Sequence, residues 1–443
     1  MKPLNDADKK TLLTDRWFPI PDRALKHPEQ QRIKTVLDSH RGQFYVGVIA
    51  AGRRSFKTER FLKRRFVAKS IEYPNERNFL GAPTRPQAKL IFWDDVKALS
   101  PDYLIKDINE TELRIDYING TQLYIVGLKE YDRVHGVRWN RVGISEYQEC
   151  HPKIFSTTLQ PLLIDTRGEA IVEGRPAGKN HFYDDFLRAK TSPERWASFW
   201  WSSEDILDAD QISAAKDDLG LVDYKREYLA DFESGSQKAY YAYSEGNHKP
   251  YTLNPELPVI VTCDFNAGEK PMSWVVGQAI GDLNYWTHSL AYQFTNTLTM
   301  CGILDDTLKT GMKKYPPLLR FYGDYSGVKD TSNSSRSDWE IIKDYFANKT
   351  AVETRIKPCH SVRDRVAATN ARLCNANNVC RMYANLATCR ALIKDWQYVD
   401  WKDNNVDLDG SNSERTHSSD AIDYYASYEY PVAGRVSGSQ QTR

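Results

Sequence analysis

FYVGVIAAGRRSFKT, residues 44–58, is the stretch of sequence that best indicates the fold of this chain. An apolar run, residues 44–50, precedes a short polar loop, and a helical-looking segment follows at residues 59–70. A strand, a tight loop ending in Lys-Thr and a helix, in that order, suit a phosphate-binding loop, because backbone N–H groups and the helix N-terminus surround the anionic phosphates. The stretch therefore predicts a nucleotide-binding site and makes nucleotide hydrolysis the first hypothesis.

The residues of this loop have distinct expected roles. Lys57 should reach the β- and γ-phosphates of ATP, and the Thr58 hydroxyl should bind the Mg²⁺ ion that accompanies the nucleotide. The consensus loop has glycine where this chain has Ala51 and Phe56, and a bulky residue with positive φ is costly. On this stretch alone, an ordinary strand–turn–helix remains the alternative. The residues expected to contact the nucleotide are Gly52, Arg53, Arg54, Ser55, Phe56, Lys57 and Thr58.

The composition limits the class of protein. A chain of 443 residues with 41% hydrophobic and 27% charged residues is long enough for two or three globular domains. No apolar run approaches the length of a membrane span, so we expect no membrane partner. The seven cysteines lack CxxC pairs, which favours free thiols in a reducing cytosol. The net charge of +1 indicates no polyanionic partner, and the basic run at residues 60–65 fits a solvated helix face as well as a binding surface.

The sequence pattern predicts two α/β regions that are joined by a linker. Residues 1–233 alternate between apolar strands and helices, which is typical of a parallel sheet with flanking helices. Residues 234–257 begin with Ser-Gly-Ser and contain two prolines, so we predict a linker there. A second α/β region follows at residues 258–432. The last residues, 433–443, are rich in Gly, Ser and Gln and are predicted to be disordered.

A catalytic carboxylate is expected where the apolar residues 141–144 end in Ser145-Glu146. A carboxylate at a strand end lies near the γ-phosphate, where it can polarise the attacking water. We expect Glu146 to have this role, and Glu149 is a weaker candidate. Ser145 stands where aspartate is usual; its hydroxyl can hydrogen-bond a metal-bound water but contributes no charge.

Other residues are candidates for the same site. Gln30 carries the donor and the acceptor needed to recognise an adenine edge, with Gln31 as second choice, although a surface residue at a helix start is the alternative. Arg138, or else Arg133, could neutralise charge in the transition state across a subunit interface. Arg175 lies in a polar turn after another apparent strand, where it could sense hydrolysis.

Three aspartates in the second half follow or open separate elements. Asp264 and Asp324 each end an apolar strand, and Asp420 opens a helix. This order suits a ribonuclease H-like site, in which converging carboxylates hold two Mg²⁺ or Mn²⁺ ions. One ion activates water and the other stabilises the leaving oxygen. A single strand-end aspartate usually caps or is solvated, so the prediction depends on all three together.

These motifs occur in an order that resembles the large terminase subunit of tailed bacteriophages, the motor-nuclease that packages DNA into procapsids. The resemblance extends over nearly the whole chain, from residue 27 to residue 420. It is carried by residues 27–30, 52–58, 82–88, 144–147, 174–183, 323–327 and 417–421. No single motif is decisive, whereas their order and spacing are specific.

The resemblance implies an α/β fold with an N-terminal P-loop ATPase domain and an RNase H-like nuclease domain behind it. The ATPase would form a homo-oligomeric ring on the portal protein of the procapsid and translocate double-stranded DNA. The nuclease would cut the DNA concatemer to start and end packaging. The small terminase subunit is a further implied partner. The implied location is the host cytoplasm, transiently at the portal, and not the mature virion.

At the matching positions of this sequence, the resemblance implies that Lys57 and Thr58 bind phosphate and magnesium and that Glu146 is the hydrolytic carboxylate. It implies a trans-acting finger at Arg138 and a coupling turn at Arg175. The nuclease metals would be held by Asp264, Asp324 and Asp420.

Two other interpretations remain open. The first is a stand-alone RNase H-fold nuclease or resolvase with a structural, inactive P-loop, because Phe56 and Ser145 depart from the usual pattern. The coupling turn also lacks the Thr or Ser that usually precedes its proline, Pro176. All three departures lie in the ATPase half. They are compatible with an ATPase that is weak as an isolated chain and needs assembly of the ring for turnover. The second alternative is a DNA- or portal-binding scaffold without activity.

Overall fold

The structure is a computed structural model of the chain. It describes residues 20–129, 136–178, 180–232, 237–324, 336–358, 360–402 and 407–432. The chain divides into two compact units, unit 1 (Met1–Ile212 and Lys225–Gly235) and unit 2 (Ser213–Tyr224 and Ser236–Arg443). The functional domain bounds given above stay predictions, and the tail at residues 433–443 lies outside the described residues.

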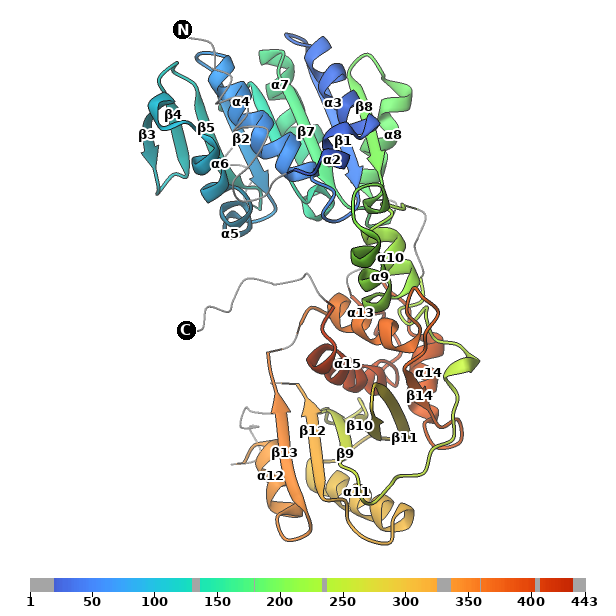
Figure 1. The fold of residues 1–443 in the computed structure, drawn as a ribbon. Helices are drawn as coiled ribbons and strands as arrows, with labels where there is room; N and C mark the ends of the chain where they lie inside the picture. Colours follow the sequence, from blue (N-terminus) through green and yellow to red (C-terminus); the bar gives the residue numbers. More distant parts are fainter. Residues whose placement is uncertain are drawn as a thin grey trace. The chain divides into compact units, whose positions relative to one another are not determined.

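Within its described residues, unit 1 is built on an eight-stranded sheet with the order β3-β4-β5-β2-β6-β7-β1-β8 (Figure 1). The six strands from β5 to β8 in this order are parallel to one another, whereas β4, near one edge, pairs antiparallel with both β3 and β5. The predicted parallel sheet is therefore confirmed. The strands are β1 Tyr45–Ala51, β2 Arg77–Ala82, β3 Ile105–Asn109, β4 Arg114–Tyr117, β5 Gln122–Gly127, β6 Arg141–Ile144, β7 Glu169–Gly174 and β8 Trp196–Trp201.

Helices cover both faces of this sheet. Side chains of β1 alternate between two apolar clusters, since Tyr45 and Ile49 pack on the side of α2, α3 and α4, and Val46 and Val48 pack on the side of α7 and α8. These helices are α2 Asp22–Lys26, α3 Pro28–Ser39, α4 Arg65–Glu72, α5 Arg85–Ala88, α6 Asp94–Leu99, α7 Gln160–Thr166 and α8 His181–Thr191. Two more helices, α9 Ala209–Asp218 and α10 Leu221–Glu227, follow β8 and contain residues of both units. Three segments are wound as π-helix: Thr58–Arg64, Lys89–Trp93 and Ile154–Leu159.

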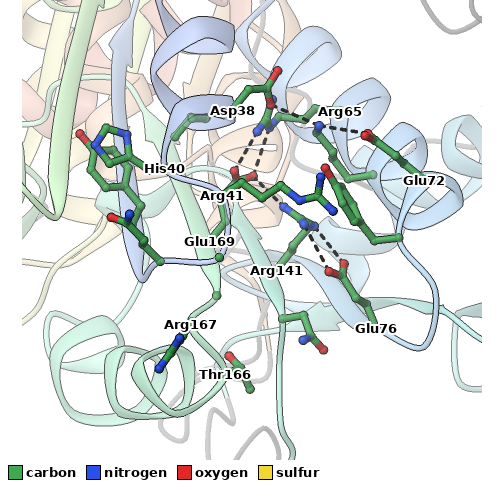
Figure 2. Close-up of a pocket in the computed structure, with 18 residues that line it drawn as sticks. Asp38, His40, Arg41, Arg65, Glu72, Glu76, Arg141, Thr166, Arg167 and Glu169 are labelled. Carbon is green, nitrogen blue, oxygen red and sulfur yellow. Dashed lines mark hydrogen bonds and ion pairs between the residues drawn. The ribbon is translucent and has the colours of Figure 1, made fainter.

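A cavity of about 430 Å³ lies at the amino ends of β1, β6 and β7, opposite the edge where β1 meets the predicted phosphate loop (Figure 2). Its charged groups pair with one another. Arg65 donates to both carboxylate oxygens of Glu169, at 3.1 and 2.8 Å, and Arg141 Nε donates to Glu76 at 3.0 Å. Burial alone would raise the pKa of Glu169, but Arg65 and Arg141 hold it below its usual value. The cavity walls thus join α4, β6 and β7 by buried ion pairs.

Replacing Glu169 with Ala should lower the free energy of unfolding by about 3 kcal/mol, because the buried Arg65 guanidinium would lose the carboxylate that accepts two of its hydrogen bonds and would keep only Asp38, 3.0 Å away. Urea unfolding of the full chain measures this. The matched control is Glu72→Ala, since Glu72 pairs with Lys69 at the surface and should contribute less than about 1 kcal/mol.

The effect of Glu169 should depend on pH. Because its folded-state pKa is lowered, its stabilisation is complete above the unfolded-state pKa of about 4.3 and is lost as pH falls through the folded-state value. The gap between wild type and Glu169→Ala should therefore narrow on acidification. A gap that widens as pH falls would contradict this assignment.

Unit 2 contains, within its described residues, a six-stranded sheet with the order β13-β12-β9-β10-β11-β14. The first three strands along the chain form an antiparallel meander, and β12 joins β9 in parallel. The predicted strands before Asp264 and Asp324 are present. The strands are β9 Val259–Asp264, β10 Met272–Ile280, β11 Leu283–Tyr292, β12 Leu318–Gly323, β13 Ala351–Ile356 and β14 Met382–Ala384.

Helices also cover both faces of the second sheet. One apolar cluster joins α11 and α12 to the sheet, and another joins α13, α14 and α15 to its other face (Figure 1). These helices are α11 Thr297–Gly311, α12 Asp338–Phe346, α13 Val362–Leu373, α14 Arg390–Tyr398 and α15 His417–Glu429. In the part of the chain that the structure describes, no helix has both the length and the apolar character needed to cross a bilayer.

Candidate functional site

The loop predicted to bind phosphate leaves the carboxyl end of β1. Gly52 begins it, and a Cβ there would lie 2.1 Å from Ser203 Oγ and 2.3 Å from the Tyr228 carbonyl oxygen, so only glycine fits. Arg54 and Phe56 adopt positive φ values of 56° and 64°. Phe56, where the consensus has glycine, packs against the core of unit 1. This burial offsets a backbone cost of about 1–2 kcal/mol.

The Gln30 side chain supports this loop from α3. It is fully buried, so the alternative of a surface residue is wrong. Its Nε2 donates to the Ser55 carbonyl oxygen at 3.0 Å, and Arg60 Nη1 donates to its Oε1 at 3.0 Å. Both ends of the amide are therefore used within the protein, and contact with an adenine edge would require both bonds to be exchanged. The base contact stays a prediction.

The predicted phosphate and magnesium residues converge on Glu173, at the end of β7. Thr58 Oγ1 donates to Glu173 Oε1 at 2.7 Å, and Ser145 Oγ donates to the same oxygen at 2.6 Å. Lys57 Nζ lies 3.8 Å from Glu173 Oε2 and donates to the Gly52 carbonyl oxygen at 3.3 Å. The carboxyl ends of β1, β6 and β7 thus bring one ammonium, two hydroxyls and one carboxylate together.

Glu146 directly follows this cluster with a left-handed backbone conformation, φ 53° and ψ 42°. Its Oε2 accepts hydrogen bonds from Gln148 Nε2 at 2.6 Å and from Arg175 Nη2 at 3.1 Å. Burial alone would raise the pKa of Glu146, but the charges of Arg175 and Lys57 and the bond from Gln148 lower it to about 2. Glu149, the weaker candidate, lies 3.7 Å from Arg175 and is about half exposed.

A second carboxylate, Glu227 at the end of α10, connects the loop to the predicted coupling turn. Arg53 Nε donates to Glu227 Oε2 at 2.5 Å, and Arg175 Nη1 pairs with the same oxygen. The Arg53 backbone N–H also donates to the Glu227 carbonyl oxygen at 2.8 Å. Arg175 therefore binds both Glu146 and Glu227, while Arg54 is exposed to solvent.

The predicted arginine finger lies at the surface. The Arg138 side chain is 83% exposed, and its Nε lies 3.4 Å from Asp165 Oδ2. An exposed arginine is available to a neighbouring subunit, so the trans-acting role stays a prediction. Its alternative, Arg133, lies outside the described residues.

Sequence reasoning assigned no role to Glu173 or Glu227. The signal for Glu173 was a charge near the end of an otherwise apolar strand, where an unpaired carboxylate is costly. Glu227 gave no such signal, because its partner Arg53 is 174 residues away in sequence.

In unit 2, Asp264 ends β9 and contacts the first residue of α15. Its Oδ2 accepts from Asn266 Nδ2 at 2.5 Å and lies 2.9 Å from His417 Nδ1. His417 Nε2 lies 3.1 Å from the Ser413 carbonyl oxygen, which fixes the ring from its other side. The sequence predicted no role for His417 or Asn266. Both side chains orient the carboxylate of Asp264, which was predicted as a metal ligand.

Asp420 lies one turn further along α15. Burial raises its pKa to about 6, with a contribution from the negative charge of Asp264, while Arg365, 3.6 Å away, opposes the shift. Burial also raises the pKa of Tyr424, and the charges of Asp264, Asp420 and Asp324 raise it further. All three predicted carboxylates therefore act electrostatically on one tyrosine.

The donor chemistry of this site suits divalent cations. Carboxylate oxygens are the ligands that Mg²⁺ and Mn²⁺ prefer, and a cation would relieve the repulsion between Asp264 and Asp420. Among the residues that the structure describes, however, no three His, Cys, Asp or Glu side chains form a group able to hold a metal ion. Residues 325–335, directly after Asp324, lie outside that description. The two-metal site stays a prediction.

Comparison with solved structures shows that the chain is similar in fold to large terminases over nearly its whole length. The large terminase from the thermophilic bacteriophage D6E matches with a TM-score of 0.60 and 14% identity, over 93% of this chain and 99% of that chain. Its complex with ATP-gamma-S gives a TM-score of 0.61 at 12% identity, with coverage of 93% and 99%. Its complex with ADP gives 0.60 at 13%, with coverage of 92% and 99%.

At these identities the likeness establishes the fold, and the predicted fold class, a P-loop unit followed by an RNase H-like unit, is confirmed. No protein-family model matches the sequence, and comparison with curated protein sequences gives no match.

Proposed function

We propose that this chain is a large terminase subunit, a motor that couples ATP hydrolysis to translocation of double-stranded DNA into procapsids and cuts concatemeric DNA. The likeness of fold over nearly the whole chain supports this proposal most strongly. The similar structures with ATP-gamma-S and ADP support ATP as the nucleotide. Lys57 and Thr58, which follow β1, and Glu146, which follows β6, lie at strand ends on either side of β7, and the charge of Lys57 lowers the pKa of Glu146; this arrangement supports the chemistry.

In the ATPase site, Lys57 would bind the β- and γ-phosphates and the Thr58 hydroxyl would hold Mg²⁺. The ion would neutralise charge on the phosphates. Glu146 is ionised at neutral pH, because its pKa is lowered to about 2, and it would orient and polarise the attacking water. Arg175 holds this carboxylate in place through its 3.1 Å hydrogen bond.

In the nuclease site, Asp264, Asp324 and Asp420 would hold two Mg²⁺ or Mn²⁺ ions. The ions would activate water and stabilise the leaving oxygen of the phosphodiester. His417 and Asn266 hold the Asp264 carboxylate at the end of β9.

The partners proposed for this chain follow from the same fold likeness. They are double-stranded DNA, the portal protein of the procapsid, the small terminase subunit and further copies of the chain in a ring. The exposed Arg138 is the residue we propose to act across the ring interface. The proposed location is the host cytoplasm and, transiently, the procapsid portal.

Replacing Lys57 with Ala should separate the two activities. Loss of a charged hydrogen-bond donor should weaken ATP binding about 10- to 100-fold and stop ATP-driven packaging, while Mn²⁺-dependent DNA nicking continues at the wild-type rate. The measurements are calorimetric ATP binding, packaging into procapsids and plasmid nicking. Lys34→Ala, on the exposed face of α3, is the matched control and should change neither activity.

The outcome distinguishes the proposal from its alternatives. If wild type and Lys57→Ala both nick DNA at the same rate and neither hydrolyses ATP nor packages DNA, the P-loop is structural and the chain is a stand-alone nuclease. If wild type binds procapsids but neither hydrolyses ATP nor nicks DNA, the chain is a scaffold.

A further inference from the structure

The strand that precedes the catalytic glutamate ends without the usual negative charge. Ser145 occupies the position at which P-loop ATPases carry the aspartate that holds Mg²⁺. β7 runs parallel to β6, and its register pairs Ile144 with Val172. The next residues in the two strands are Ser145 and Glu173, so a carboxylate stands directly beside the serine.

The hydrogen bonds tie this carboxylate to the magnesium residue. Glu173 Oε1 accepts from Thr58 Oγ1 at 2.7 Å and from Ser145 Oγ at 2.6 Å. Thr58 is the residue expected to bind Mg²⁺, and Ser145 is the residue that lacks the charge. One carboxylate oxygen of β7 therefore contacts both hydroxyls that surround the expected ion.

The second oxygen of Glu173 remains available to a ligand. Glu173 is 1% exposed, and its Oε2 accepts no hydrogen bond from the described residues. The Lys57 ammonium faces this oxygen, but Nζ is 3.8 Å from Oε2, which is too long for a hydrogen bond. A buried carboxylate oxygen is costly unless a charge or donor meets it.

We propose that Glu173 supplies the negative charge that Ser145 lacks, and so positions Mg²⁺ at Thr58 for nucleotide binding. The inference rests on the proposed ATPase function and concerns a positioning residue on β7. The strand order β6-β7-β1 allows Glu173 to take the place of the missing aspartate, because β7 lies between the strand that leads to Ser145 and the strand that leads to the phosphate loop. From this middle strand, the Glu173 carboxylate contacts both Ser145 and Thr58.

The test is Mg²⁺ titration of the full chain with ATP-gamma-S bound, followed by calorimetry, with parallel nucleotide binding in EDTA. Glu173→Gln should weaken Mg²⁺ affinity about 10- to 100-fold and leave metal-free nucleotide affinity unchanged. The amide keeps the size and one acceptor oxygen of the carboxylate. Glu173→Asp, which keeps the charge on a shorter stem, should retain part of the affinity and serves as a second variant if the glutamine variant folds poorly.

Moving the carboxylate from β7 to β6 makes the test specific. Ser145→Asp alone would place a carboxylate against Glu173 and should destabilise the fold through like-charge repulsion. The double variant Ser145→Asp/Glu173→Gln restores one carboxylate on the opposite strand and should recover most of the Mg²⁺ affinity and the stability. Glu194→Gln, exposed and remote from this cluster, is the control.

Three outcomes would overturn the inference. They are unchanged Mg²⁺ affinity in Glu173→Gln, an equal loss of nucleotide affinity with and without Mg²⁺, and a double variant no better than Glu173→Gln. The proposed function fails separately, if wild type binds no nucleotide under either condition.

Discussion

Replacing Glu146 with Gln should lower ATP turnover by about 10²- to 10⁴-fold in the presence of DNA and procapsids, while nucleotide affinity changes little. The amide keeps the shape of the side chain but removes the charge that polarises water. Because Glu146 contacts neither Lys57 nor Thr58 through a hydrogen bond, binding of the phosphates should persist. Steady-state phosphate release and equilibrium ATP binding measure the two quantities.

The environment of Glu146 also predicts how this activity depends on pH. Its pKa is lowered to about 2, so the carboxylate stays ionised at neutral and mildly acidic pH. A carboxylate with so low a pKa is a weak base, which favours orientation and polarisation of water over outright proton removal. Glu146 should therefore cause no fall in turnover between about pH 5 and pH 8.

The matched control for Glu146→Gln is Glu194→Gln, an exposed position on the segment before β8. It should hydrolyse ATP as wild type does. Equal turnover by wild type and Glu146→Gln would rule out the motor function, because no other described carboxylate has the corresponding place at the end of β6.

Replacing Asp264 with Asn should lower Mn²⁺-dependent DNA cleavage by at least about 10²-fold, since loss of a residue that only orients a metal ligand already costs 10- to 100-fold. ATP turnover should be unaffected. The change removes a charge without removing the oxygen that Asn266 and His417 contact, so the end of β9 should keep its structure. Nicking of supercoiled plasmid across a Mn²⁺ titration measures the effect.

The control for this variant is Asp306→Asn on the exposed side of α11, which should cleave DNA normally. Asp420→Asn should resemble Asp264→Asn if both carboxylates hold the same pair of ions. Full cleavage by Asp264→Asn at low Mn²⁺ would exclude the proposed metal site, and it would leave the ATPase proposal standing.

Local sequence determined much of this molecule. The apolar run before Gly52 and the Lys57-Thr58 pair predicted a strand, a loop and a helix, because hydrophobic periodicity and phosphate-loop chemistry are both encoded within about fifteen residues. The strand ends at Asp264 and Asp324 and the helix start at Asp420 followed from the same local patterns. Burial was harder to predict: the sequence left open a surface position for Gln30, and the structure buries this side chain against the loop.

Only the tertiary structure decided which side chains that are distant in sequence come into contact. Glu173 and Ser145 meet because β6 and β7 are parallel neighbours in register, and Glu227 reaches Arg53 from 174 residues away. The order of strands in a sheet depends on how whole elements pack, and no local pattern in the chain specifies it. For this reason the sequence alone led to the predictions of a phosphate loop and of a catalytic role for Glu146, while the carboxylate beside Ser145 became evident only from the packing of one strand against the next.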